Sequence, residues 1–272
     1  MKSAPISVLI PCFCCASTIR RAVDSVFAQT LAPTEVILVD DASDDETPAA
    51  LRQLERDYHG RISVVPLKVN CGAASARNTG WALATQPYVA FLDADDSWHP
   101  EKLRVQYEYM NTHPDIAVCG HGRAHLRDDA DPGAPAKNPA ATNITATGLL
   151  FSNAFSTPTV MAKRTIPFRF PEGQRYVEDA FLWQQVALSG LAIVRLESDL
   201  AYIHKAPYGS SGLSGQLWKM ERAELANFVS HFRAERIGSG LLAAATLFSL
   251  AKFLKRLLVR GAGTLQNKGA RA

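Results

Sequence analysis

The sequence predicts an α/β fold, a doubly wound sheet followed by a helical C-terminal tail, and two observations carry this prediction. First, two apolar runs end directly in carboxylates. Val36–Val39 runs into Asp40–Asp41, and Tyr88–Leu92 runs into the acidic segment Asp93–Asp96. Such runs are typical of buried parallel strands. Second, strand and helix patterns alternate over residues 6 to 112, which implies a parallel sheet with right-handed crossovers.

Each element of this alternation has its own signal. Helices are expected where apolar residues recur every three or four positions. Thr47 and Pro48 are a good helix start, because a hydroxyl cap precedes a proline at the first helical position. In chain order, the predicted elements are a strand over Ile6–Ile10, a helix from about Ser17, the strand ending at Asp40, a helix from Thr47, a strand over Ile62–Leu67, a helix over Gly72–Ala84, the strand ending at Asp93 and a helix from Pro100.

The carboxylates at the two strand ends predict a binding site. Ligands of an open parallel sheet lie beyond the carboxyl ends of its strands. Acids gathered there repel one another unless a cation or hydrogen-bond donors hold them, which favours a divalent metal and a nucleotide. The turn Pro11–Ala16 has no G-x-G-x-x-G pattern, and no P-loop pattern occurs in the chain. A metal held by Asp93–Asp96 is therefore the candidate for neutralising phosphates.

The regular alternation stops near residue 114. A further strand is expected at Ile116–Cys119, a mobile loop over Asp128–Asn143, and a helix over Val177–Ser189 that Gly190 closes. The prediction therefore divides the chain into a nucleotide-binding half (1–114), a second half of the same domain (115–239) and a tail (240–272).

Composition supports a folded body with a basic appendage. Hydrophobic residues make up 47% and charged residues 20% of the 272 residues, and the net charge is +3. The charge is uneven, because the chain after Leu250 contains basic residues and no Asp or Glu. These basic residues are Lys252, Lys255, Arg256, Arg260, Lys268 and Arg271.

The tail predicts a basic amphipathic helix. The apolar run Leu241–Ala251 is too short to span a bilayer, which needs about 20 residues. From Leu247, a helical projection puts Lys252, Lys255, Arg256 and Arg260 on one arc and apolar residues on the opposite arc. Such a helix suits the surface of an anionic membrane. The alternative is a helix packed on the body with a solvated basic face.

The five cysteines favour a reducing compartment, because their number is odd and no signal peptide is recognised. Cys12 and Cys15 have C-x-x-C spacing, which permits a redox motif. The alternative is that they are small residues in a tight turn after the first strand.

Five segments together resemble glycosyltransferase family 2, whose members have the type A glycosyltransferase fold. The resemblance runs from Ile6 to about His204, and the order and spacing of the segments make it specific. The segments are Val8–Pro11, Val39–Thr47, Gly72–Gly80, Phe91–Asp96 and Glu178–Trp183. The resemblance implies a Rossmann-like, doubly wound mixed sheet. It also implies an inverting transferase, with 1–114 as the nucleotide-sugar-binding half and 115–239 as the acceptor-side half.

The resemblance assigns donor-binding roles to the first half. It places Pro11 and Asp41 against the nucleotide base, and a carboxylate at Asp40 or Asp41 suits an imide or ribose proton. Arg77 lies at a family position near the donor, where a guanidinium binds phosphate or base. The alternatives are loop capping for Asp40 and Asp41, and an ion pair with a clustered acid for Arg77.

Asp93-Ala94-Asp95 matches the family's D-x-D signature. By this resemblance, Asp95 and Asp96 are the expected ligands of Mn²⁺ or Mg²⁺, while Asp93 meets the ribose or a metal-bound water. His204 is expected as a third ligand or a phosphate donor, with a structural role as the alternative.

The resemblance makes Asp179 the catalytic base and groups Glu178 with the substrate-binding residues. Inversion needs one base, about 3 Å from the acceptor hydroxyl. The alternative for both acids is stabilisation of a helix N-terminus. Trp183 lies one helical turn later. It is expected either to form the floor of a sugar pocket or to be part of the core. One departure concerns Cys14, because the family commonly has Asn there, which puts roles within Cys12–Ala16 in doubt.

The expected protein is therefore a metal-dependent, inverting glycosyltransferase that uses a UDP- or dTDP-sugar. Its expected acceptor is a lipid-linked saccharide in cell-surface polysaccharide synthesis. It is expected to be cytoplasmic, peripheral on the inner face of the cell membrane, with no nucleic-acid partner. The alternatives are a nucleotidyltransferase-like enzyme, although Pro11–Ala16 contains no Lys or Arg, and a non-catalytic sugar-nucleotide-binding protein, although base and D-x-D are both present.

Overall fold

The computed structural model describes residues 3–125, 139–204 and 216–269, with side chains described as far as residue 259. The chain divides into two units. The first runs to Leu149 and resumes over Asn153–Ala206, and the second comprises Leu150–Ser152 and the chain from Pro207 onward.

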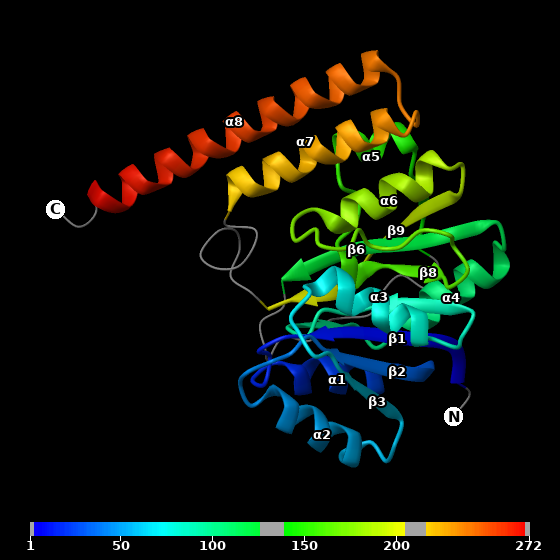
Figure 1. Cartoon of the computed structure of the whole chain (residues 1–272). Coiled ribbons are helices and arrows are strands. Elements are labelled where there is room, and N and C mark those ends of the chain that lie inside the picture. The colour runs from blue at the N-terminus through cyan, green and yellow to red at the C-terminus, as the bar shows by residue number, and fades with distance from the viewer. Residues whose placement is uncertain (1–2, 126–138, 205–215, 270–272) are drawn as a thin grey trace. The chain divides into compact units, whose positions relative to one another are not determined.

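Strands and helices alternate through the first 112 residues (Figure 1), except that two strands, Tyr88–Phe91 and Asp96–Trp98, precede the last of these helices. The described helices are α1 (Ile19–Phe27), α2 (Thr47–Asp57), α3 (Ala73–Leu83), α4 (Lys102–Thr112), α5 (Ala146–Phe151), η1 (Thr157–Thr159), α6 (Glu178–Leu188), α7 (Leu217–Arg233) and α8 (Ser239–Gly269). The described strands are β1 (Ser3–Cys12), β2 (Ala32–Asp40), β3 (Ile62–Pro66), β4 (Tyr88–Phe91), β5 (Asp96–Trp98), β6 (Ile116–His125), β7 (Ala141–Asn143), β8 (Met161–Lys163) and β9 (Ala192–Ile203).

One mixed sheet organises the first unit. Its strand order is β3-β2-β1-β4-β8-β6-β9-β5, with β7 paired to β9. The four strands from β3 to β4 are parallel, and β8 runs antiparallel to both of its neighbours. Strands β6 and β9 are parallel, whereas β5 and β7 are antiparallel to β9. The prediction of a doubly wound mixed sheet is confirmed.

A hydrophobic layer covers each face of this sheet. On one face, Val8 and Ile10 of β1 belong to a buried cluster that includes residues of α1, α2 and α4. On the other face, Leu9 of β1 belongs to a cluster that includes Trp81 of α3 and Leu182 of α6. Because successive strand residues point to opposite faces, an almost wholly apolar strand needs a helix layer on both sides.

The second half of the chain differs from the prediction in several elements, among them α5 and η1, which lie where no helix was expected. Residues Ala141–Asn143, expected to be part of a loop, form strand β7 on the edge of β9. All three side chains are exposed, so no apolar pattern marks this strand in the sequence. The rest of the predicted loop, up to residue 138, lies outside the described residues. Helix α7, over Leu217–Arg233, is a further element that had not been predicted.

Strands from both predicted halves join in the one sheet, because β4 pairs with β8 and β5 pairs with β9. The division at residue 114 and the role of each half stay predictions. The second unit contains α7 as well as α8, which includes most of the predicted tail. Among the described helices, none is long and apolar enough to cross a membrane.

Candidate active site

Three adjacent parallel strands end at the same edge of the sheet. In the register of β1 and β2, Cys12 lies opposite Asp40, and in that of β1 and β4, Leu9 lies opposite Phe91. The half-buried Pro11, the pair Asp40–Asp41 and the segment that follows β4 therefore share this edge. This is the edge where an open α/β sheet binds its ligands.

The first two acids hold the loops around them. Asp41 is 2% exposed, and its Oδ1 and Oδ2 accept the backbone N–H groups of Cys71 and Gly72, each at 2.8 Å. Asp40 is also buried, and its Oδ1 accepts the N–H of Ser43 at 3.1 Å. The loop-capping alternative therefore describes both residues in this structure. Contact with a nucleotide base stays a prediction for them and for Pro11.

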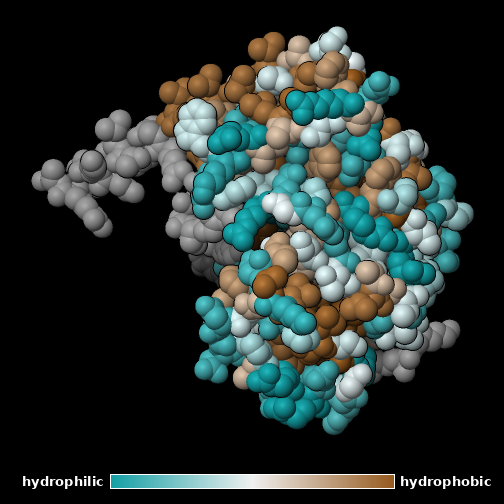
Figure 2. All heavy atoms as spheres, in the orientation of Figure 1, coloured by the Kyte–Doolittle hydropathy of each residue, from teal (hydrophilic) through white to brown (hydrophobic). Residues whose placement is uncertain are grey.

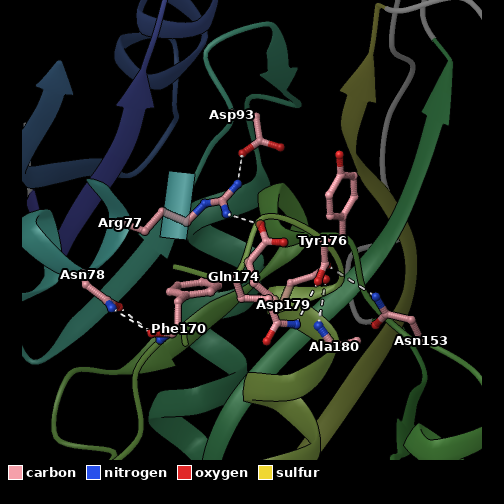
Figure 3. Close-up of polar contacts among 10 residues, drawn as sticks. Arg77, Asn78, Asp93, Asn153, Phe170, Gln174, Tyr176, Asp179 and Ala180 are labelled. Carbon is pink, nitrogen blue, oxygen red and sulfur yellow. Dashed lines mark hydrogen bonds and ion pairs between the residues drawn. The ribbon is translucent and has the colours of Figure 1, made fainter. Parts of the chain in front are cut away.

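Arg77 joins two segments that lie far apart in the sequence (Figure 3). Its Nη2 contacts Asp93 Oδ1 at 2.7 Å, and its Nη1 contacts Glu178 Oε1 at 3.1 Å, although Glu178 lies 101 positions later. The Arg77 side chain is 6% exposed, and its guanidinium carbon lies 5.3 Å from the centre of the Phe170 ring. Desolvation opposes the charge, but the charges of Asp93 and Glu178 prevail and raise the Arg77 pKa.

The pair with Asp93 matches the ion-pair alternative for Arg77. The pair with Glu178 had not been foreseen, because nothing in the local pattern of either segment indicates a partner so distant. The shared guanidinium places the D-x-D segment and the first turn of α6 side by side. Donor and phosphate contacts of Arg77, Asp93 and Glu178 stay predictions.

Asp179, the predicted base, lies at the first turn of α6 and is half-buried. Its Oδ1 accepts the N–H of Ala180 at 2.7 Å, and its Oδ2 accepts a longer bond of 3.4 Å from the amide of Asn153 (Figure 3). Desolvation raises the pKa of Asp179, and the charge of Asp93 adds to that rise, whereas Ala180 N–H, Arg77 and Asn153 oppose it. A carboxylate whose pKa is raised is a stronger proton acceptor than an ordinary one.

Glu178 shares this environment. Desolvation and the charge of Asp179 raise its pKa, and Arg77 opposes the rise. Glu178 and Asp179 are neighbouring carboxylates, and the guanidinium of Arg77 lies between Glu178 and Asp93. Negative charge is therefore concentrated where Glu178 and Asp179 are poorly solvated. Groups with perturbed pKa values of this kind are typical of functional sites.

Backbone strain marks the same segments. Cys14, Ala42 and Val177 have φ values of 46°, 57° and 49°, in the left-handed region that disfavours residues with a Cβ. These three residues lie just after β1, just after β2 and directly before α6. For Val177, whose side chain is β-branched, this conformation is a genuine outlier. Strain of this kind persists where surrounding structure holds it, and it clusters at functional sites.

Strands β5 and β9 place the predicted metal ligands at neighbouring backbone positions. In their antiparallel register Asp96 lies opposite Ile203, so His204 follows directly across from Asp95. The Nε2 of His204 lies 2.8 Å from Ser97 Oγ, and the backbone oxygen of Asp95 accepts a bond from Arg21 at 2.9 Å. Within the described residues, no group of three or more His, Cys, Asp or Glu side chains is arranged to hold a metal ion.

Trp183 belongs to the core, which corrects the interpretation of this residue as the floor of a sugar pocket. Its side chain is 0% exposed, and its ring centre lies 5.9 Å from that of Phe170 and 6.2 Å from that of Phe91. A side chain enclosed by other aromatic rings presents no surface to a sugar.

No role was predicted for Phe13, which is 51% exposed beside the strained Cys14.

All five cysteines are free thiols. Cys12 and Cys15 are buried at the end of β1 and in the turn after it. The position of Cys12 and Cys15 matches the alternative that they are small residues in a tight turn after the first strand. The redox motif stays a prediction.

The family model of glycosyl transferase family 2 matches residues 7–165, which is more than half of the chain. The chain therefore belongs to glycosyltransferase family 2.

A curated relative from Escherichia coli is the UDP-Glc:alpha-D-GlcNAc-diphosphoundecaprenol beta-1,3-glucosyltransferase WfgD. It is 31% identical over 183 residues, which cover 66% of this chain and 69% of the relative. Two further curated relatives match over shorter segments, which span 36% and 41% of their lengths.

Two solved structures share the fold. S. aureus TarS in complex with UDP-GlcNAc has a TM-score of 0.64 at 22% identity, covering 94% of this chain and 72% of TarS. The mannosyltransferase PcManGT from Pyrobaculum calidifontis, in complex with GDP-Man and Mn2+, has a TM-score of 0.64 at 18% identity. That match covers 99% of this chain and 80% of PcManGT.

Proposed function

We propose that this chain transfers a sugar from a nucleoside-diphosphate donor to an acceptor hydroxyl, with inversion at the anomeric carbon. The observation that supports this most is the double ion pair of Arg77 with Asp93 and Glu178. It links the acidic segment after β4 to the helix that carries Asp179. A base beside the donor edge is the arrangement that a single displacement requires.

In this proposal Asp179 takes the proton of the acceptor hydroxyl as the oxygen attacks the anomeric carbon from the face opposite the nucleotide. The raised pKa of Asp179 suits this role, because it increases the proton affinity of the carboxylate. Arg77 acts as a positioning residue, since it orients Asp93 and Glu178 while its own charge is balanced by theirs.

The acidic edge suits a divalent cation by its chemistry. The carboxylates of Asp95 and Asp96 would hold Mn²⁺ or Mg²⁺, with the imidazole of His204 as a further donor, because β5 and β9 bring these residues together. A cation bound there would offset the charge that develops on the departing diphosphate. The Mn2+ complex of PcManGT supports this assignment.

The donor is inferred to be a UDP- or dTDP-sugar, and the acceptor a lipid-linked saccharide in cell-surface polysaccharide synthesis. The name of WfgD includes UDP-Glc and a diphosphoundecaprenol-linked sugar, and TarS was solved with UDP-GlcNAc. We infer that Asp40, Asp41 and Pro11, at the shared edge of the sheet, bind the base and ribose of such a donor. An acceptor on a lipid places the enzyme on the inner face of the cell membrane.

A product assay tests the proposal. The protein is incubated with Mn²⁺, a panel of nucleotide sugars and a diphosphate-linked saccharide acceptor, and the product's anomeric configuration is determined by NMR. Transfer with inversion is expected for one donor. Asp179→Asn should bind that donor normally and lose turnover by about 10³-fold or more. The exposed Asp115→Asn is the control. Retention of configuration, or full turnover by Asp179→Asn, would contradict the proposal.

A further inference from the structure

Helices α7 and α8 lie together in the second unit, and one side of α8 is buried against α7. Ala245, Ser249 and Phe253, at spacings of four residues, are between 0% and 4% exposed. The hydroxyl of Ser249 donates to Glu221 of α7 at 2.9 Å, and the ring of Phe253 lies 4.7 Å from that of Trp218. These contacts fix which side of α8 faces its neighbour.

Two basic residues of the predicted basic arc lie on this inner side. Lys252 Nζ contacts Glu224 Oε1 at 3.0 Å and the backbone oxygen of Phe151 at 3.0 Å, and Arg256 Nη2 lies 3.9 Å from Glu224 Oε2. The basic arc was expected to meet an anionic membrane or to be solvated. In the structure two of its members are instead held by Glu224, and neither side chain is more than a third exposed.

The opposite side of α8 carries a row of exposed leucines. Leu247, Leu250, Leu254 and Leu258, which we call the leucine strip, are 68%, 38%, 59% and 74% exposed. Their spacing of three and four residues puts them on one face over three turns, about 16 Å long. Brown atoms gather over α8 in Figure 2. A contiguous row of this kind marks an interaction surface rather than ordinary scattered exposure.

We propose that the leucine strip is a membrane-docking surface, which lies in the headgroup region of an anionic bilayer with the axis of α8 parallel to the membrane. The strip supplies the apolar face that such a helix inserts. Lys255 is exposed at the border of the strip, where its aliphatic stem can lie along the apolar face while its ammonium reaches lipid phosphate.

Charge argues for anionic lipid rather than a second copy of the chain. Six basic residues and no acid follow Leu250 in the sequence, and Glu224 holds two of the six. Two copies joined strip to strip would bring two such tails together, and like charges oppose that contact. An anionic surface attracts the same tails, with about 1 kcal/mol for each basic residue near it. Insertion of leucines and attraction of the basic tail therefore act in the same direction.

This inference deepens the proposed function, because it assigns the surface that holds the enzyme beside a lipid-linked acceptor. The contact itself is independent of catalysis, so the two proposals fail separately. A wild-type chain that transfers sugar to a water-soluble acceptor but does not bind vesicles would refute the docking surface alone. Vesicle binding by a protein that transfers no sugar would refute the proposed reaction alone.

The test is co-flotation of the full chain with phosphatidylcholine vesicles that contain phosphatidylglycerol. The triple variant Leu247→Ser/Leu254→Ser/Leu258→Ser should lose more than about tenfold in vesicle partition, because three inserted leucines are removed. Val229→Ser/Phe232→Ser, which removes two exposed apolar side chains of α7, is the matched control and should bind normally. Thermal unfolding checks that both variants fold. We expect them to fold because the substituted side chains are exposed.

A second variant separates the strip from the basic arc. Lys252→Gln/Arg256→Gln removes the two charges that Glu224 holds, and it should keep most of the vesicle binding of the wild-type chain. The proposal is overturned if this variant loses binding while the triple leucine variant keeps it. It is also overturned if the wild-type chain does not float with the vesicles, or if ultracentrifugation without lipid finds a dimer that the leucine variant abolishes.

Discussion

At the scale of single residues, Asp179 has an environment that favours proton transfer at a cost to stability. Its pKa is raised from its ordinary 3.8, chiefly by desolvation. Between that ordinary value and the raised one, the folded state binds more protons than the unfolded state, so stability falls as pH rises through this window and stays lower above it. Loss of stability at a functional group is a common trade-off.

Asp179→Asn should therefore stabilise the protein while it abolishes transfer. The melting temperature of the variant should exceed that of the wild type by about 2 °C or more at pH 7.5, and the difference should shrink toward pH 4 as the wild-type carboxyl becomes protonated. Differential scanning calorimetry across this pH range measures it. An unchanged or lowered melting temperature for Asp179→Asn at pH 7.5 would contradict this prediction.

Asp95 is the residue for which metal dependence can be tested most directly. Asp95→Asn should weaken UDP binding in the presence of Mn²⁺ by about tenfold or more, since an amide replaces one anionic ligand. Binding measured with a chelator should be the same in both proteins. Titration calorimetry with Mn²⁺ and with the chelator separates metal-dependent from metal-independent UDP binding. Wild-type affinity of the variant in Mn²⁺ would remove Asp95 from the metal site.

Much of the site could be predicted, because strand ends in a parallel sheet share an edge and the acids lie directly after apolar runs. The positions of Asp40, Asp41 and Asp93 follow from that rule alone. The partners of those acids could not be predicted. Which backbone N–H groups Asp41 accepts, and that Glu178 shares a guanidinium with Asp93, depend on how α3 and α6 pack on the sheet.

At the scale of elements, Arg77 connects α3, the segment after β4 and α6. Its side chain is 6% exposed, so removal of the guanidinium leaves two carboxylates without their cation in a poorly solvated place. Arg77→Leu should lower the free energy of unfolding by about 3–5 kcal/mol, as measured with urea.

The matched control is Arg20→Leu, which breaks an ion pair with Asp57 whose side chains are 53% and 35% exposed. The loss should be much smaller than for Arg77→Leu, because water screens exposed pairs. Equal losses in the two variants would mean that Arg77 contributes no more than an ordinary surface charge.

The elements with strong local periodicity were the ones that the sequence could indicate. Strand β1 and helix α2 have apolar spacings that match one structure only. Strand β5 has three buried residues and no alternation, and β7 has three exposed ones, so neither has a pattern to detect. The orientation of α8 could not be predicted from the sequence, because either face of an amphipathic helix can pack inward. In the structure, the side of α8 that contacts Glu221 and Glu224 of α7 is the one that packs inward.

At the scale of the whole molecule, the first unit has its own core on both faces of the sheet and contains every predicted site residue. A chain that ends at residue 206 should therefore remain folded. It should keep the rise in melting temperature on addition of UDP and Mn²⁺, because ligand binding stabilises the native state.

The same shortened chain should no longer float with anionic vesicles, since it lacks α7 and α8. Thermal shift and flotation on the two chains measure both outcomes. A shortened chain that unfolds, or one that floats as well as the full chain, would contradict this division of roles.

The bridge at Arg77 also constrains any attempt to build chimeras from relatives in this family. An exchange of the segment that includes α6, intended to change which acceptor is used, would exchange Glu178 as well, and a parent without an acid there would leave the buried guanidinium with one partner instead of two. Recombination points should therefore be chosen so that Arg77, Asp93 and Glu178 are always inherited from the same parent.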